Sequence, residues 1–168
     1  MVSLAKLYHA EIAPEIQPAL VEQWVEIDIP GLAPSLTGTI DVLDQAGALI
    51  DLKTASKAWP SGRAQHSHQA TIYHKLVEAV TGKPPAEIRF EVMVKGIKPR
   101  RQTIPTSRTE ADFQALVGRL AIIHRLILAG ILPPAPAGSW ICGPRYCGYF
   151  WTCAYIPAHQ KILPKDTS

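Results

Sequence analysis

Apolar and polar positions alternate with the two-residue period of β-strands in two separate parts of the chain. These parts are residues 19–29 and residues 86–96, and each predicts a strand with one buried face. In the second part, four apolar side chains would share that face, namely Ile88, Phe90, Val92 and Val94. Residues 100–104 predict a further short strand.

Helical spacing of apolar positions predicts three helices. The first covers residues 1–16, with a break at Pro14, and the second covers residues 64–80 and ends at a Thr-Gly-Lys-Pro-Pro stop pattern. The third begins at a capping box made by Thr109 and Asp112. Its helically spaced positions are Phe113, Leu116, Val117, Leu120, His124, Ile127 and Leu128.

Residues 36–44 and 48–54 predict a hairpin whose strands carry charges in their interiors, at Asp41, Asp51 and Lys53. A three-residue loop ending in Gly47 would make Asp41 the direct cross-strand neighbour of Asp51. A two-residue loop would instead pair Asp41 with Ile50 and place the acids on different faces. The three-residue loop also puts four apolar residues on one face, so we prefer it: Ile40, Val42, Ile50 and Leu52.

Carboxylates that lie directly opposite each other on a sheet repel. A divalent cation between Asp41 and Asp51 would remove this repulsion, since Mg²⁺ binds one or two carboxylates together with waters and phosphate oxygens. Lys53 lies on the same predicted face and could add positive charge beside a phosphate or an attacking water. The competing interpretation is a solvated face on which Lys53 offsets the two acids.

The predicted elements follow the order α-β-β-β-α-β-(β)-α and are followed by an aromatic, cysteine-containing tail. Strands that occur both in a hairpin and on either side of a helix predict an α/β fold with a mixed central sheet flanked by helices. The length of 168 residues suits one domain. We expect this domain to cover residues 1–156, with the aromatic segment at 138–156 and a mobile tail at 157–168.

A net charge of +3 permits a nucleic-acid partner without requiring one. The apolar stretch 115–132 is interrupted by Arg119, His124 and Arg125, so it does not predict a membrane span. The start of the chain shows no signal-peptide pattern. The 3 cysteines do not resemble a secreted disulfide framework. We therefore expect a cytoplasmic protein with reduced thiols and no membrane partner.

The spacing of Asp41 and Asp51-Leu52-Lys53 follows the D…(D/E)-x-K pattern of the PD-(D/E)XK nuclease superfamily. The stretch GTIDVLDQAGALIDLKTASK resembles the RecB-like exonuclease branch, including its phage and prophage members. The Q-x-x-x-Y motif of that branch has a counterpart in Gln69 and Tyr73. Two further stretches, EIQPALVE and WICGPRYCGYFWTC, resemble the preceding strand and the cysteine-bearing C-terminal segment of those members. The resemblance implies a restriction-endonuclease-like αβββαβ core.

By this resemblance, Asp41, Asp51 and the backbone carbonyl of Leu52 would bind Mg²⁺ or Mn²⁺. Lys53 would orient the water and stabilise charge on the phosphate, and the side chains of Gln69 and Tyr73 would face the site. Two further residues are candidates for an additional metal ligand. Glu22 matches an acid common in relatives, and His9 is the candidate on the N-terminal helix, where relatives often carry a histidine.

Some relatives hold a four-iron cluster with three C-terminal cysteines and one upstream cysteine. This chain has no upstream cysteine, so a four-cysteine iron–sulfur cluster cannot form within it. Cys142, Cys147, Cys153 and His159 could supply a structural zinc set, although their spacing is looser than in the usual paired-cysteine sites. Reduced thiols packed among aromatic side chains are the favoured interpretation.

Cationic side chains predicted near strand ends are candidates for phosphate contacts. They are Lys57, Arg63, Lys95, Lys98, Arg100 and Arg101. Together with the resemblance, they predict a metal-dependent DNA nuclease of phage or prophage recombination, repair or processing, acting as an exonuclease on single- or double-stranded ends in a bacterial cell. The alternative is a non-catalytic DNA-binding or assembly module with the same fold. A second copy of the chain or a recombination protein would be the further partner.

Overall fold

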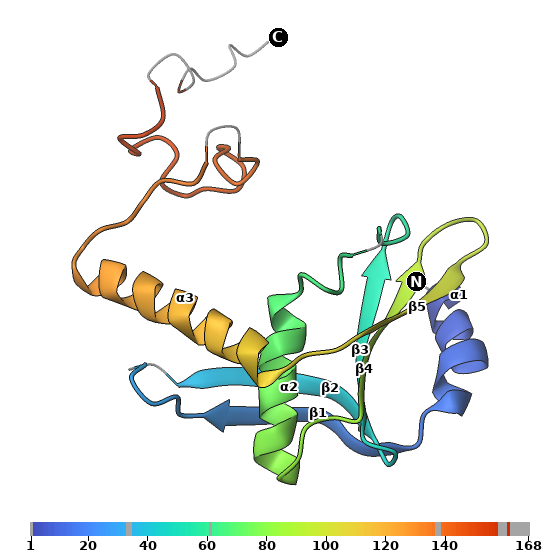
Figure 1. Cartoon of the computed structure of the whole chain (residues 1–168). Helices are drawn as coiled ribbons and strands as arrows, with labels where there is room; N and C mark the ends of the chain where they lie inside the picture. Colours follow the sequence, from blue (N-terminus) through green and yellow to red (C-terminus); the bar gives the residue numbers. More distant parts are fainter. Residues whose placement is uncertain (1, 33–34, 61, 137–138, 158–160, 162–168) are drawn as a thin grey trace, which may run out of the picture. The chain divides into compact units, whose positions relative to one another are not determined.

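The computed structural model describes residues 2–32, 35–60, 62–136, 139–157 and 161. The chain divides into two compact units, residues 1–124 and residues 125–168. The first unit contains the sheet and all but the end of the helical structure (Figure 1). The expected single domain over residues 1–156 stays a prediction, as does the mobile tail.

The sheet has five strands in sequence order, which are β1 (Pro18–Ile27), β2 (Leu36–Asp44), β3 (Ala48–Ala55), β4 (Glu87–Val94) and β5 (Arg100–Thr106). The β3–β4 pair is parallel and the other neighbours are antiparallel. Parallel strands need a crossover, which α2 (His68–Thr81) supplies. The predicted α/β class with a mixed sheet flanked by helices is therefore confirmed.

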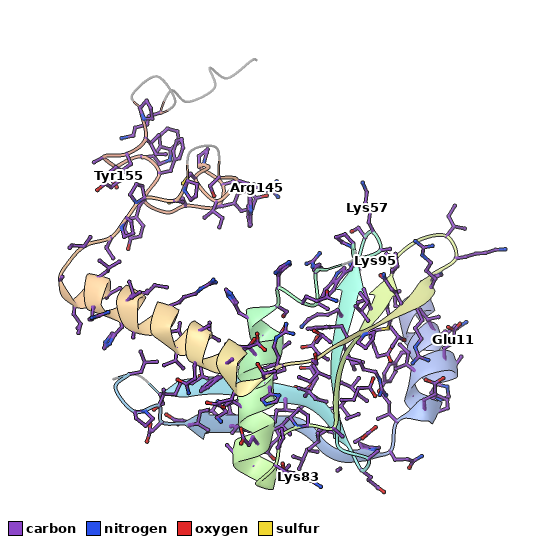
Figure 2. All side chains as sticks on the ribbon, viewed as in Figure 1. Glu11, Lys57, Lys83, Lys95, Arg145 and Tyr155 are labelled. Carbon is purple, nitrogen blue, oxygen red and sulfur yellow. The ribbon has the colours of Figure 1, made fainter. Side chains whose placement is uncertain are left out.

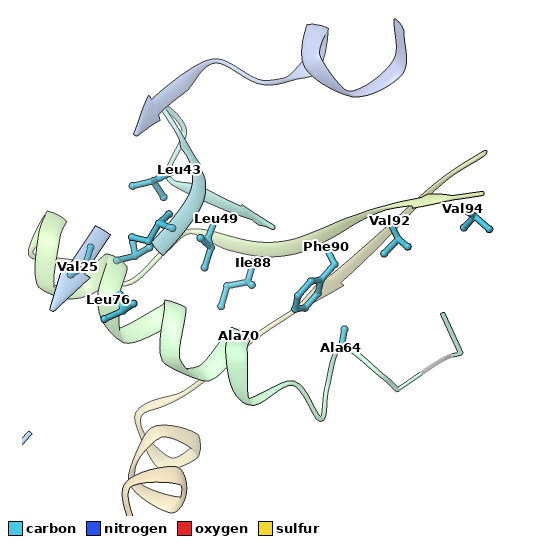
Figure 3. Close-up of a cluster of buried hydrophobic side chains, with 12 residues drawn as sticks. Val25, Leu43, Leu49, Ala64, Ala70, Leu76, Ile88, Phe90, Val92 and Val94 are labelled. Atoms are coloured by element: carbon cyan, nitrogen blue, oxygen red, sulfur yellow. The ribbon is translucent and has the colours of Figure 1, made fainter. Parts of the chain in front are cut away.

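Helix α2 covers one face of the sheet, over a cluster of buried apolar side chains from β1 to β4 (Figure 3). The predicted shared face of β4 is confirmed, since Ile88, Phe90, Val92 and Val94 all belong to this cluster. Gly38 lets α2 approach β2 closely, because a Cβ there would lie 2.7 Å from Cδ1 of Leu76. Helix α2 begins later than the predicted residue 64, because the side chain of Ser67 accepts a hydrogen bond from Ala70 N and caps the helix there.

The N-terminal segment covers the opposite face of the sheet. It contains α1 (Val2–Leu7), a π-helical turn (Tyr8–Ile12) and a 3₁₀ turn (Ala13–Glu15). The predicted helix over residues 1–16 is thus helical throughout most of its length but changes its winding, and Pro14 lies in the last turn. Its apolar side chains pack on those of β2, β3 and β4, in a cluster of Leu7, Ile12, Ile16, Val42, Ala48, Ile50 and Met93.

The hairpin of β2 and β3 has the predicted three-residue loop. Val42 pairs with Ile50 and Leu43 with Leu49, and Gly47 has a φ of 82°. The expectation that Ile40 shares a face with Val42 is wrong, because Ile40 packs in the cluster under α2. The reason is that β2 stops pairing with β3 beyond Val42 and continues along β1, which runs across the direction of β3 (Figure 1).

Helix α3 (Glu110–Leu128) begins at the predicted capping box. Thr109 N donates to Asp112 Oδ2 at 2.8 Å, and Asp112 N donates to Thr109 Oγ1 at 3.3 Å. In its first half Phe113 and Leu116 are buried. No helix among the described residues is long and apolar enough to cross a membrane.

The second unit contains the end of α3 and a series of turns over residues 139–157. Edge-to-face aromatic pairs form within it, between Trp140 and Tyr146 and between Phe150 and Trp151. Phe150 is buried. The aromatic residues of this segment therefore pack partly on one another.

Candidate active site

The two hairpin acids meet where the pairing of β2 and β3 ends. Extending the pairs Val42–Ile50 and Leu43–Leu49 by one residue places Asp41 opposite Asp51, as predicted. The backbone N–H of Leu52 then donates to Asp41 Oδ2 at 3.0 Å instead of to the backbone of β2. A side-chain carboxylate thus takes the place of a ladder hydrogen bond, and this fixes Asp41 beside β3.

Asp51 is buried on the face of the sheet that α2 covers, with only 2% of its side chain exposed. Lys53 Nζ donates to Asp51 Oδ1 at 3.0 Å and lies 2.7 Å from Oδ2. The approach to Oδ2 has the distance of an ion pair but not the direction of a hydrogen bond. Oδ2 is therefore a buried oxygen without a hydrogen-bond partner in the described part of the chain.

Burial raises the pKa of Asp51 to about 6 from its ordinary 3.8, because desolvation disfavours the charged form. The hydrogen bond and positive charge of Lys53 act in the opposite direction, and the negative charge of Asp41 raises the pKa further. The positive charge of Lys53 alone thus does not offset the burial of Asp51 and the negative charge of Asp41. The site has room for more positive charge.

Helix α2 directs Gln69 and Tyr73 toward the same site from one turn of the helix. Gln69 Nε2 donates to Tyr73 Oη at 2.9 Å. Burial raises the pKa of the Tyr73 phenol, and the charges of Asp41, Asp51 and Lys53 also act on it, which places the phenol within reach of their field. Tyr73 is therefore protonated at neutral pH, and its hydroxyl hydrogen donates to no residue that the structure describes.

A pocket of about 960 Å³ adjoins the site, between the end of β3, the following loop and the start of α2. The side chains that matter for chemistry in its lining are Lys53, Lys57, Trp59, Arg63, His66 and Gln69. Lys53 and Gln69 connect this pocket with the acids. A polyanion bound in the pocket would therefore be held beside the carboxylate pair.

The sequence profile of the PD-(D/E)XK nuclease superfamily matches residues 2–154. The chain belongs to this superfamily. A search of curated proteins finds no match.

Two solved structures share the fold of this PD-(D/E)XK chain. A "Putative exonuclease" from Eubacterium rectale has a TM-score of 0.59 at 14% identity, with 99% of this chain and 61% of that chain covered. The protein SSO0001 has a TM-score of 0.52 at 16% identity, with 96% and 67% covered. This chain thus spans about three fifths of the length of the first neighbour.

The carboxylate pair of this PD-(D/E)XK chain fits a divalent cation. The buried Oδ2 of Asp51 accepts no hydrogen bond from the described residues and has only the Lys53 ammonium beside it, so cation ligation would stabilise it further. In a strand the N–H and C=O of one residue point the same way, so the carbonyl of Leu52 faces the side on which its N–H meets Asp41. Oxygen donors of this kind suit Mg²⁺ and Mn²⁺. No group of three or more His, Cys, Asp or Glu side chains within the described ranges could hold a metal, so waters would complete the shell.

Of the two further ligand candidates, Glu22 lies near the acids and His9 does not. Glu22 lies opposite Asp41 in register, because Val21 pairs with Val42 and Gln23 with Ile40. Its φ of 48° is unusual for a non-glycine residue and marks an irregularity in β1 beside the acids. His9 is exposed on the N-terminal segment, which packs on the face opposite to α2, so the structure does not bring it to the acids.

The six candidate DNA-binding cations also separate into groups. Lys57 and Arg63 line the pocket. Lys95, Lys98 and Arg100 are exposed around the β4–β5 turn, and Figure 2 shows Lys95 at the same end of the sheet as Lys57. Arg101 instead makes ion pairs with Glu91 and Glu15 and donates to the carbonyl of Glu11, so it holds the N-terminal segment on the sheet.

The three cysteines are partly exposed and not disulfide-bonded. Cys142, Cys147 and Cys153 form no metal-binding group with other described residues, and His159 lies outside the described residues. The structural zinc set stays a prediction.

Sequence reasoning missed three residues that shape the pocket. Trp59 lines it, and Gln102 on β5 bonds to both the N–H and the carbonyl of Trp59. Arg108, which follows the end of β5, donates hydrogen bonds to carbonyl groups of the loop before α2. A tryptophan within an otherwise polar loop is a signal that could have been noticed, whereas nothing near Gln102 or Arg108 in the sequence predicts these long-range contacts.

Proposed function

We propose that this chain is a Mg²⁺- or Mn²⁺-dependent deoxyribonuclease that hydrolyses phosphodiester bonds. The observation that carries the proposal is the buried Oδ2 of Asp51, which accepts no hydrogen bond from the described residues. It lies across from Asp41 and beside the Lys53 ammonium in a member of a nuclease superfamily. A structural acid would have its oxygens satisfied. An acid kept short of partners is typical of a ligand site.

Asp41, Asp51 and the Leu52 carbonyl would hold the cation, and Glu22 is the additional candidate because it lies opposite Asp41. When bound, such a cation supplies Lewis-acid stabilisation of the phosphate and lowers the pKa of water. The protein contributes the geometry. The Leu52 N–H fixes Asp41, and the surrounding core fixes Asp51.

Lys53 is proposed to act on the substrate. Its side chain is 29% exposed, so the ammonium group reaches the pocket while it contacts the buried carboxylate. There it would neutralise charge that develops on the phosphate oxygens and orient the attacking water. Preorganised charge of this kind is a large contribution to catalysis, because no reorganisation is needed during the reaction.

Gln69 and Tyr73 would position the phosphate from the other wall. Gln69 donates to the Tyr73 oxygen, which leaves the Tyr73 hydrogen to donate to a phosphate oxygen. The raised pKa of Tyr73 keeps this donor protonated. We assign both residues to positioning and not to proton transfer.

The substrate is proposed to be a DNA end, held by Lys57 and Arg63 in the pocket and by Lys95, Lys98 and Arg100 around the next turn. Exonucleolytic action is supported by the name of the Eubacterium rectale neighbour. A role in phage or prophage recombination or repair rests on the resemblance of the hairpin stretch to those members.

The proposal is tested by incubating the protein with linear single- and double-stranded DNA in Mg²⁺, in Mn²⁺ and in chelator. Lys53→Ala and Asp51→Asn should each lower the cleavage rate at least about 100-fold. Lys83→Ala is the matched control, because Lys83 lies at the end of the unit opposite to Lys57 (Figure 2). This variant should cleave DNA at the wild-type rate. Cleavage that persists in chelator, or full activity in both site variants, would contradict the proposal. Absence of cleavage in every condition would favour the non-catalytic DNA-binding module.

A further inference from the structure

The pocket beside Lys53 is lined by two side chains in contact with each other, Arg63 and Trp59. The guanidinium carbon of Arg63 lies 4.1 Å from the centroid of the Trp59 ring, in a cation–π contact. Arg63 is exposed, and its guanidinium group has no hydrogen bond or ion pair with any residue that the structure describes. The guanidinium carbon lies over the indole, and the guanidinium donors remain available to a ligand.

The tryptophan beneath Arg63 is rigidly held. Trp59 N donates to Gln102 Oε1 at 2.9 Å, and Gln102 Nε2 donates to the carbonyl of Trp59 at 3.1 Å. The indole also packs on Phe90 of the core, with 5.3 Å between ring centroids. A loop residue tied to β5 and to the core in this way serves as a fixed platform.

The segment after Arg63 is held just as firmly. Arg108 Nη2 donates to the carbonyls of Ala64, Gln65 and Ser67, and Arg108 Nε donates to Thr71 Oγ1 at 2.9 Å. Ala64 itself is fully buried. Trp59 before Arg63 and residues 64–67 after it are thus held by the fold before any ligand binds, which lowers the entropy cost of binding beside them.

We propose that the Arg63–Trp59 pair is a stacking subsite for one unpaired nucleobase, and that the pocket therefore accepts single-stranded DNA ends in preference to duplex. The inference rests on the proposed nuclease function and names its substrate. Guanidinium planes and aromatic rings are the surfaces on which unpaired bases stack. Inside a duplex both faces of each base are covered by its neighbours, and at a duplex end only the outer face of the terminal pair is open. An unpaired or splayed base can therefore use the subsite more fully than a paired base. Lys57 and Lys53 would then contact the flanking phosphates.

The test measures binding by fluorescence anisotropy in chelator, so that no cleavage occurs. The ligands are a short single-stranded oligonucleotide, the same oligonucleotide with one abasic site moved through each position, and a hairpin duplex. Arg63→Lys keeps the charge and removes the planar stack. It should weaken single-strand binding about tenfold. An abasic site at one or two positions should weaken binding by the wild-type protein about as much as Arg63→Lys weakens binding of the intact oligonucleotide. At those positions the abasic site should not weaken binding by Arg63→Lys any further.

Lys57→Gln is the matched variant, because it removes a charge from the same pocket without touching the stack. It should weaken binding to all ligands alike. The subsite is contradicted if Arg63→Lys binds as the wild type does, or if no abasic position weakens binding. It is also contradicted if Arg63→Lys loses equal affinity for the single strand, for the oligonucleotides with an abasic site at every position, and for the duplex.

The same experiment separates this inference from the proposed function. Metal-dependent cleavage by a protein that shows no base-dependent binding would leave the nuclease standing and overturn the subsite. Base-dependent binding through Arg63 without cleavage in any metal would support the subsite and overturn the nuclease.

Discussion

The sheet buries two carboxylates on neighbouring parallel strands, and they have opposite environments. Asp51 lies on β3 with its side chain on the α2 face, whereas Glu91 on β4 pairs in register with Leu52 and lies on the face of the N-terminal segment. Their side chains are 2% and 0% exposed. Burial alone therefore does not distinguish them, and the difference must come from their partners.

Glu91 has every partner it needs. Arg101 Nε donates to Oε2 and Arg101 Nη2 donates to Oε1, both at 2.8 Å, while Thr103 Oγ1 donates to Oε2 and Arg89 Nε donates to Oε1. Burial alone would raise the pKa of Glu91, but the hydrogen bonds and charges of Arg101, Thr103 and Arg89 together hold it below its usual value. This network also ties the N-terminal segment to the sheet through Glu15. Glu91 is a structural acid.

Asp51 has one lysine, a second acid beside it and an oxygen that accepts no hydrogen bond from the described residues, so burial raises its pKa instead. The same fold thus satisfies one buried acid fully and leaves the other open to a ligand. The comparison predicts that replacing Glu91 damages folding, while replacing Asp51 damages function.

The largest stability effect is expected for Glu91→Gln. Loss of the charge leaves Arg101 and Arg89 without their buried partner, and breaking a buried pair in this way costs about 3 kcal/mol or more. Glu87→Gln is the control, since Glu87 is exposed and pairs only with Arg89, and it should cost less than about 1 kcal/mol. Urea unfolding measures both, and equal losses would remove the structural assignment of Glu91.

An effect of opposite sign, and of at most about 3 kcal/mol, is expected for Asp51→Asn in chelator. The Asp51 carboxyl has a pKa of about 6 in the folded protein and an ordinary value of 3.8. When this carboxyl is ionised, the folded state is therefore about 3 kcal/mol less stable than it would be with an unshifted pKa. Wild-type stability should therefore gain this amount as the pH falls through 6 toward 3.8. Asp51→Asn should be more stable than the wild type by up to that amount near pH 7 or above, and the advantage should shrink toward pH 4.

Thermal or urea unfolding from pH 4 to pH 8 measures this difference. Asp28→Asn changes an exposed acid that accepts from Ser35, and it should show no comparable gain. A destabilised Asp51→Asn at neutral pH would mean that Asp51 serves the fold in the same way as Glu91.

Tyr73→Phe should have the smallest of the expected effects, a moderate loss in the rate of DNA cleavage. The variant removes the free hydrogen-bond donor while it keeps the ring that packs against β2 at Gly38. Loss of one hydrogen bond from a neutral donor to the charged phosphate should lower kcat/KM at least about tenfold, equivalent to about 1.4 kcal/mol. Tyr8→Phe, on the opposite face of the sheet, is the control. A rate equal to that of the wild type would exclude Tyr73 from the site.

Local patterns were enough to predict the hairpin of β2 and β3 and its register. Gly47 fixes the loop length, and the loop length fixes Asp41 opposite Asp51, because each step from a turn is determined by the period of a strand. The position of Ile40 could not be predicted in this way. It depends on where β2 leaves β3 to follow β1, which is a property of the whole sheet.

Long-range partners were also outside the reach of the sequence. Arg101 stands in a run of cations that suggests DNA contacts, yet it binds Glu91 and Glu15. Its role is set by an acid on the neighbouring strand and by the N-terminal segment. Arg108 is a similar case, since its partners lie about 40 residues earlier in the chain. Charge patterns predict that cations are present but not which acid or carbonyl they will meet.

The most direct test of the account is calorimetric titration of Mn²⁺ into the wild-type protein, Asp51→Asn and Glu91→Gln. We expect Asp51 Oδ2 to ligate the metal and the hydrogen-bond network of Glu91 to serve only the fold. The wild type and Glu91→Gln should then bind Mn²⁺ with the same affinity, and Asp51→Asn should bind it at least about tenfold more weakly. Undiminished Mn²⁺ binding by Asp51→Asn, or an equal loss in both variants, would contradict it.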